Sequence, residues 1–177
     1  MLKINFSNIT ITLLNLNNIL NMQKLNLPTF NFKFKEKESS VLIFDEIRKK
    51  YVKLTPEEWV RQNFLMFLNT AKHCPLNLMA LEMPFTQNET DKRSDIVVYN
   101  KTGQIIILVE CKAPSVQLSQ KVFDQAAGYN LHLKSEILII TNGISHYCCK
   151  PDYENRKWMF MNDIPDYAEL TPSICID

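Results

Sequence analysis

The spacing of apolar and polar residues divides the chain into short segments of two kinds. Apolar residues recur three and four positions apart in residues 55–73 and 117–133, which predicts two helices. Alternating or continuous apolar residues predict strands or extended segments in the rest of the chain, namely in residues 25–40, 41–54, 78–85, 93–112, 135–143, 144–150 and 158–161. Strands on both sides of each helix favour an α/β fold with a mixed sheet.

The first predicted helix has clear signals at its start. Thr55 can cap the helix, and Pro56 suits the first helical position. Glu57 and Glu58 follow in the first turn, where negative charge meets the positive end of the helix dipole. The apolar stripe of this helix consists of Val60, Phe64, Phe67 and Leu68. The helix is therefore expected to pack against a core and to begin with two acidic residues.

Residues 93–112, RSDIVVYNKTGQIIILVECK, predict a hairpin that carries charges at its open end. The polar residues Asn100–Gly103 suit the turn. With that turn, Asp95 lies opposite Leu108, and Glu110 and Lys112 follow on the same face at period two. Asp95 and Glu110 then become diagonal neighbours, on the order of 7–8 Å apart at their Cα atoms. Two carboxylates and an ammonium group should therefore converge on one face of the sheet.

The chemistry of this group of residues suggests a metal-dependent hydrolase. Two neighbouring carboxylates repel each other unless they share a cation, and Mg²⁺ favours one or two such ligands together with phosphate oxygens. A nearby lysine can hold an attacking water, as metal-assisted phosphodiester hydrolysis requires. The simpler interpretation is a surface salt bridge between Glu110 and Lys112, which would contribute little. The apolar strand before them and Ala113-Pro114 after them favour the functional interpretation.

Five short blocks resemble a known family. TPEEWVRQ, RSDIVVYN, ILVECKAP, DQAAGYN and LIITNG, in this order, are similar to the N-terminal nuclease domain of type I restriction enzyme R subunits, especially to small stand-alone members. Asp95 and Glu110-Cys111-Lys112 resemble the D…E-x-K core of PD-(D/E)XK nucleases. The resemblance covers residues 44–149 and implies a restriction-endonuclease-like core, in which helices flank a mixed central sheet.

The resemblance implies roles for the hairpin residues. Asp95 and Glu110 would bind Mg²⁺, for which Mn²⁺ could substitute, and Lys112 would assist the water. A helical glutamate often completes such a site, and either Glu58 or Glu57 could fill this position. Glu58 is preferred because it shares a helix face with Gln62. The alternative is that both glutamates only stabilise the start of the helix.

Gln125 and Tyr129 resemble the Q-x-x-x-Y element of RecB-like nucleases. They lie four residues apart on one helix face, so Gln125 could reach the catalytic site and Tyr129 a phosphate or base of DNA. An amphipathic helix with Tyr129 in the core explains the same spacing equally well.

Composition restricts the possible partners and compartment. The net charge is +1, so DNA contact would need a local patch, for which Lys92 and Arg93 are candidates. The five cysteines are scattered without a C-x-x-C pair, which favours a reducing cytoplasmic compartment over disulfides. His73-Cys74 and His146–Cys149 lack the spacing of a structural zinc site. Apolar runs are too interrupted to span a membrane.

We expect residues 1–24 to be an extension, in which residues 1–21 are either a disordered tail or translated sequence upstream of a true start at Met22, and residues 25–177 to form one nuclease-like domain. The chain has three glycines and lacks the G-x-x-x-x-G-K-[ST] loop of a nucleotide-driven motor. The chain could therefore cut alone, act with a motor or specificity subunit supplied by another chain, or be a derivative whose role has changed. The leading hypothesis is a Mg²⁺-dependent DNA endonuclease of a restriction system. The alternative is a catalytically inactive DNA-binding or assembly module.

Overall fold

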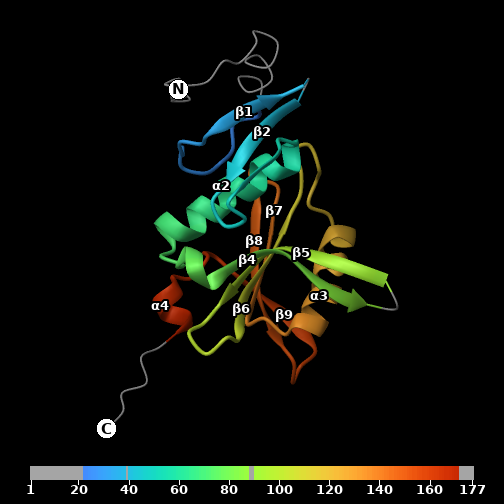
Figure 1. The fold of residues 1–177 in the computed structure, drawn as a ribbon. Helices are drawn as coiled ribbons and strands as arrows, with labels where there is room; N and C mark the ends of the chain where they lie inside the picture. Colours follow the sequence, from blue (N-terminus) through green and yellow to red (C-terminus); the bar gives the residue numbers. More distant parts are fainter. Residues whose placement is uncertain (1–21, 39, 88–89, 172–177) are drawn as a thin grey trace.

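The computed structural model describes residues 22–38, 40–87 and 90–171. These residues form an α/β fold with two sheets (Figure 1). The expected extension therefore lies almost entirely outside the described residues, and its predicted disorder stays a prediction. The fold confirms the prediction of a mixed α/β architecture with helices beside the sheet.

The smaller sheet comes first in the chain. It is antiparallel, with the strand order β1-β2-β3. Its strands are β1 (Phe34–Lys37), β2 (Ser40–Asp45) and β3 (Lys50–Lys53). Alternate residues of β2, such as Val41 and Ile43, are buried, as the period of two predicts.

The larger sheet has six strands in the order of the chain, β4 to β9. Only the pair β6–β7 is parallel within the described residues, and α3 forms the crossover between these two strands. The strands are β4 (Met79–Gln87), β5 (Thr90–Tyr99), β6 (Ile105–Cys111), β7 (Ile137–Thr141), β8 (His146–Asp152) and β9 (Lys157–Met161).

Helix α2 (Pro56–Ala71) lies between the two sheets (Figure 1). The core cluster around it contains Ile43 of the smaller sheet and Ile96 of the larger sheet, together with Phe64 of the helix. Because both sides of the helix are covered, even polar residues on it are buried; Gln62 is 1% exposed. This position explains why α2 can hold buried charges, which the predicted single apolar stripe did not anticipate.

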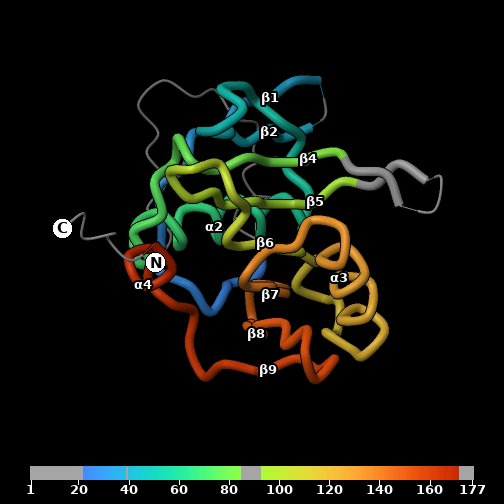
Figure 2. Tube along the Cα trace, turned by 90° about the horizontal axis from the view of Figure 1, so that it is seen from below, coloured from blue at the N-terminus to red at the C-terminus, as the bar shows by residue number. Residues whose placement is uncertain are grey.

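Helix α3 (Gln120–Leu133) covers the opposite face of the larger sheet (Figure 2). Ala126 and Tyr129 pack there against Val97, Leu108 and Leu138. Because successive residues of a strand point to opposite faces, the α2 face and the α3 face have separate core clusters. The remaining short helices are η1 (Leu76–Leu78) and α4 (Tyr167–Leu170). No helix among the described residues is both long enough and apolar enough to cross a membrane.

The segment before β1 packs along the domain as an extended strap. Asn26 N donates to Gly143 O at 2.7 Å, and Trp59 Nε1 donates to Gln23 O at 3.2 Å. Gly143 has a φ of +80°, and a Cβ there would come within 2.7 Å of Leu25 Cδ2. The positive φ therefore favours glycine in the turn after β7, and a side chain there would also displace Leu25 of the strap.

Candidate active site

The N-terminus of α2 positions two glutamates beside the larger sheet. Thr55 caps the helix as predicted, since its Oγ1 accepts a hydrogen bond from Glu58 N at 3.0 Å. Pro56 occupies the first helical position. Glu58 is buried, whereas the side chain of Glu57 is 46% exposed. The two neighbouring acids thus enter different environments.

The β5–β6 hairpin turns where predicted but has a different register. Gly103 N donates to Asn100 O at 3.1 Å, which confirms the turn. The predicted pairing of Asp95 with Leu108 is wrong, because Val97 lies opposite Leu108. A bulge next to Tyr99 takes up the extra residue Ile106, and Ile106 and Ile107 consequently both pack in the α2-side core.

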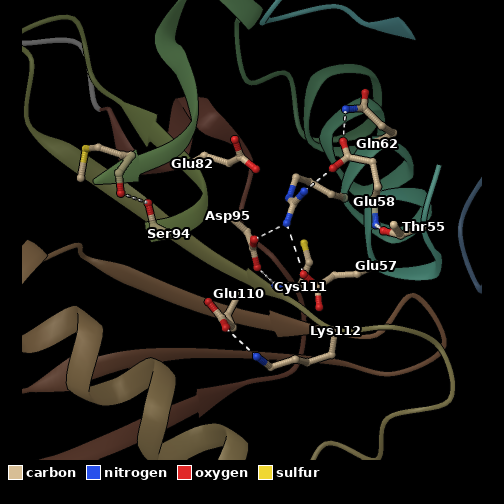
Figure 3. A network of polar contacts seen from close by, with 12 residues as sticks. Thr55, Glu57, Glu58, Gln62, Glu82, Ser94, Asp95, Glu110, Cys111 and Lys112 are labelled. Carbon is tan, nitrogen blue, oxygen red and sulfur yellow. Dashed lines mark hydrogen bonds and ion pairs between the residues drawn. The ribbon is translucent and has the colours of Figure 1, made fainter. Parts of the chain in front are cut away.

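The turn and the bulge each shift the predicted pairing by one residue, because Tyr99 pairs with Ile105 and Val98 then pairs with Ile107. Ile96 pairs with Val109, so continuing this register by one residue places Asp95 directly opposite Glu110. The pairing shifts by two residues relative to the prediction, and a shift of two preserves the face. The expected convergence of Asp95, Glu110 and Lys112 at one end of the hairpin is therefore retained (Figure 3).

Asp95 and Glu110 have different partners. Asp95 accepts hydrogen bonds from Arg61 Nη2 at 2.5 Å and from Cys111 N at 2.6 Å. Glu110 accepts one from Lys112 Nζ at 2.8 Å. Both acids are buried, at 8% and 6% exposure. Asp95 is thus anchored through both oxygens, while Glu110 depends on the lysine.

The site carries more negative charge than its own lysine can balance. Burial, followed by the charge of Asp95, raises the pKa of Glu110 to about 7. Burial and Asp95 also raise the pKa of Glu57. Burial lowers the pKa of Lys112, but its hydrogen bond and charge interaction with Glu110 outweigh burial, so that the net pKa is raised. Lys112 is therefore charged at neutral pH beside carboxylates in need of a cation.

A second ionic group lies deeper, and we call it the inner cluster: Asp45, Arg48, Glu58 and Gln62. Arg48 Nε donates to Asp45 Oδ2 at 2.6 Å, and Arg48 Nη2 donates to Glu58 Oε1 at 2.8 Å. Gln62 Nε2 donates to both acids at 2.8 Å. Glu58 is thus held by partners that neutralise its charge.

We call Glu57, Asp95, Glu110 and Lys112 the outer cluster. Glu57 interacts electrostatically with Asp95, Glu110 and Lys112, whereas Glu58 points toward Gln62 (Figure 3). The preference for Glu58 as the helical acid of the site therefore lacks support from these contacts. Gln62, which motivated that preference, ties Glu58 to the inner cluster instead. Glu57, the alternative that the sequence left open, is the better placed residue.

Arg61 links the two clusters and was missed by the sequence analysis. Its guanidinium binds Glu58, Asp95 and, at 3.4 Å, Glu57. Its Nε atom is buried without a hydrogen-bond partner among the described residues. A signal was present in the sequence, because Arg61 lies three and four residues after the two glutamates on the same helix. Arg48 likewise pairs with buried acids, which the sequence pattern did not predict.

The remaining predicted residues are more peripheral. Gln125 is exposed and donates to Tyr129 Oη at 2.6 Å. Tyr129 is 7% exposed and belongs to the α3-side core, as the amphipathic-helix alternative expects. Arg93 is exposed on β5, two residues before Asp95. The side chain of Lys92 lies outside the described part of the structure. Catalytic and DNA-binding roles for these residues stay predictions.

The cysteines and histidines do not form a metal site among the described residues. Burial raises the pKa of Cys74 to about 12 and that of Cys149 to about 12. His146 lies beside Thr141, with 2.7 Å between its Nδ1 and the threonine Oγ1. Cys74 and Cys149 are packed in the two core clusters.

The chain is similar to proteins of type I restriction enzymes. A fragment of a protein described as an HsdR subunit of a type I restriction enzyme from Vibrio vulnificus YJ016 is 23% identical, with a TM-score of 0.39. The alignment covers 52% of this chain and 19% of that chain, so the present chain corresponds to a small part of its length. A search of curated proteins gave no significant match. Residues 56–165, more than half of the chain, match the family Type I restriction enzyme R protein N terminus, and the chain belongs to this family.

Proposed function

We propose that this chain is a Mg²⁺-dependent deoxyribonuclease that hydrolyses phosphodiester bonds within a restriction system. The observation that carries the proposal is the pair of buried carboxylates, Asp95 and Glu110, at the open end of the β5–β6 hairpin, with Lys112 bonded to Glu110. A buried acid with a raised pKa beside a charged partner, as Glu110 is beside Lys112, is a candidate for chemistry. Family membership supports the same proposal.

The donor set fits Mg²⁺. Asp95, Glu110 and Glu57 offer hard carboxylate oxygens, and burial together with the charge of Asp95 raises the pKa of Glu110 to about 7, so a cation beside the pair would be favourable. No group of three or more acidic, histidine or cysteine side chains among the described residues is arranged to hold a metal alone. Mg²⁺ does not need such a cage, because it keeps several waters and uses one or two carboxylates with substrate phosphate oxygens. Bound Mg²⁺ would supply Lewis-acid stabilisation of charge on the phosphate.

The protein's own groups have separable roles. Cys111 N and Arg61 hold the Asp95 carboxylate in place and fix its orientation. Lys112 keeps its proton, and its ammonium can donate to an attacking water or to a phosphate oxygen once Glu110 shares its charge with a cation. Arg61 neutralises part of the Asp95 charge before a metal binds. Catalysis would therefore require the carboxylates to exchange one cationic partner for another.

DNA is the proposed substrate, and Arg93, which is exposed on β5 two residues before Asp95, would contact a phosphate outside the cluster. A motor or specificity subunit from another chain would direct the nuclease to its target. The competing proposal is a catalytically inactive DNA-binding or assembly module. It is favoured by one observation: both oxygens of Asp95 are already engaged by Arg61 and Cys111.

A supercoiled-plasmid nicking assay with Mg²⁺, Mn²⁺ or chelator tests the proposal. We expect nicking with either metal and none with chelator. Lys112→Ala should reduce the rate roughly 10²–10³-fold, the usual effect of losing one electrostatic or proton-handling group. Metal binding, measured by calorimetry, should survive in this variant. Lys101→Ala, which alters an exposed lysine in the hairpin turn, is the matched control and should cut normally.

Isosteric variants separate catalysis from folding. Asp95→Asn and Glu110→Gln keep side-chain shape but remove the carboxylates, and they should lose metal binding and nicking together. Absence of nicking by the wild type with either metal, combined with strong destabilisation of both variants, would instead support the inactive module.

A further inference from the structure

An aromatic pocket lies on the α3 face of the larger sheet, apart from the two ionic clusters. Its volume is about 170 Å³. Phe123, Tyr147 and Phe160 form its walls, and their rings contact each other: Phe123 and Phe160 at 5.5 Å between centroids, Tyr147 and Phe160 at 6.4 Å. Leu118 and Ile140 add apolar surface, and Ser119 and Gln120 add polar groups.

The aromatic side chains of this pocket are unusually exposed. Phe160 is 62% exposed and Tyr147 is 46% exposed. Both lie on strands at the end of the sheet, β9 and β8. Exposed large aromatic residues that surround a hollow are a common feature of binding sites. Because these exposed rings line the pocket, a ligand with a flat apolar face would fit it best.

The strand register connects this pocket to the outer cluster. Glu110 pairs with Ile140, and Ile140 pairs with Tyr147, so these three residues lie in one row across the sheet. Residues paired across a sheet share a face. Ile140 belongs to the α3-side core, and so does Leu108, which lies two positions before Glu110 on β6. Glu110 and Tyr147 therefore also lie on the α3 face of the sheet. At about 4.8 Å per strand, Tyr147 is on the order of 10 Å from Glu110 along this row.

This separation matches nucleic acid. Stacked bases along one strand follow each other every ~3.4 Å and unstacked bases lie farther apart, so a base within about three positions of a phosphodiester at the outer cluster would reach the pocket. We infer that the pocket of Phe123, Tyr147 and Phe160 binds an unpaired nucleobase of the DNA strand whose phosphodiester is cleaved at Asp95 and Glu110. The inference rests on the proposed function and adds the substrate class, DNA that is locally single-stranded.

The chemistry favours an unpaired base over a paired one. In a duplex the faces of each base are covered by its neighbours, and only the edges are open in the grooves. Aromatic walls bind the open face of an unstacked base, and this stacking tolerates any base identity. The volume of about 170 Å³ suits a single flat ring system, since pockets for drug-sized ligands reach ~300–1,000 Å³.

The test measures binding without cleavage. Fluorescence anisotropy of a labelled single-stranded oligonucleotide, with Ca²⁺ in place of Mg²⁺, gives the affinity of the full chain. Phe160→Ala and Tyr147→Ala should each weaken binding roughly 5- to 100-fold, the range for loss of one stacked base. Met159→Ala is the control, because Met159 is 44% exposed on the same strand and pairs with Lys150 rather than with Cys149 of the α3-side core.

A second oligonucleotide identifies the stacked base. Abasic positions placed one at a time along the strand should weaken wild-type binding at one location. At that location Phe160→Ala should add no further loss, since the variant and the abasic strand remove the same contact. Single-stranded DNA should also bind more tightly than duplex DNA.

Three results would overturn the inference: equal binding by Phe160→Ala, Tyr147→Ala and the wild type; additive losses at every abasic position; or self-association that depends on Phe160 with no effect on DNA. The proposed nuclease function fails by a different result, the absence of metal-dependent nicking. A chain that nicks plasmid while Phe160→Ala binds DNA normally would therefore refute the pocket alone.

Discussion

The inner and outer clusters both combine carboxylates with a cationic side chain, but they satisfy their charges differently. In the inner cluster, Asp45 accepts hydrogen bonds from Ile47 N, Arg48 and Gln62, and it is 0% exposed. In the outer cluster, Lys112 is the hydrogen-bond partner of Glu110, whose pKa rises to about 7. Complete hydrogen bonding is what a buried ionic group needs to be structural, and residual negative charge is what a cation site needs. Burial alone does not distinguish them.

The largest effect should come from removing the central cation of the inner cluster. Arg48→Met would leave Asp45 and Glu58 buried with less compensation, and one partner lost from a buried pair typically costs about 3–5 kcal/mol. Urea denaturation at neutral pH measures the change. Lys49→Met is the control, since Lys49 is exposed and pairs with Glu46 at the surface. Similar stability of both variants would show that the inner cluster is not structural.

The outer cluster should make the protein less stable as the pH rises, whereas an ion-paired acid with a lowered pKa makes a protein less stable as the pH falls. Because the pKa of Glu110 rises from 4.5 to about 7, the folded chain retains a proton that the unfolded chain releases between these values. The free energy of unfolding should therefore fall as the pH rises through this window, by up to about 3 kcal/mol. Denaturation in chelator at several pH values measures the slope. Glu110→Gln should flatten it, and Glu136→Gln, at an exposed position, should not.

Neutralising Glu57 should mainly affect metal binding, whereas neutralising Glu58 should mainly affect stability. Glu57→Gln should weaken Mg²⁺ binding roughly tenfold, about 1.4 kcal/mol, because one carboxylate near Asp95 and Glu110 is lost. Its stability should change little. Glu58→Gln should destabilise the fold and affect metal binding less. Calorimetric Mg²⁺ titration and urea denaturation of both variants test the assignment, and the reverse pattern would restore Glu58 as the acid of the site.

The smallest effect is expected at the surface. Arg93→Ala should weaken DNA binding about threefold at low salt and reduce the salt dependence of binding by roughly one counterion. Arg156→Ala changes an exposed arginine in the β8–β9 turn and should leave binding unchanged. Anisotropy titrations at several salt concentrations distinguish the two, and equal slopes would exclude Arg93 from the DNA contact.

Local signals in the sequence predicted most of the elements. The Thr55 cap, the hairpin turn at Asn100–Gly103 and the helical spacing of α3 depend on neighbouring residues, and the structure confirms each of them. The convergence of Asp95 with Glu110 was predictable because the period of a strand fixes the face. The exact pairing was not, since a bulge is decided by which residues the core accepts, here both Ile106 and Ile107.

The ion pairs between different helices and strands could not be predicted from local sequence patterns. Arg61 meets Asp95 from a position 34 residues away, and Arg48 meets Glu58 from 10 residues away. Neither contact can be inferred without knowing that α2 lies between two sheets. The same packing determines that Glu58 turns inward and Glu57 outward, so a choice between adjacent glutamates required the tertiary structure.

The bulge at Ile106 limits how the β5–β6 hairpin can change length during evolution. Hairpins usually tolerate insertions and deletions, but a change of one residue in β6 would turn Glu110 and Lys112 to the α2 face unless another irregularity compensated. Homologues that keep the outer cluster should therefore differ from this chain in the length of β6 by an even number of residues, for example by the loss of Ile106 and one neighbour. The catalytic proposal thus predicts that insertions and deletions in β6 of homologous hairpins come in even numbers, and the sequences of homologues alone can test this.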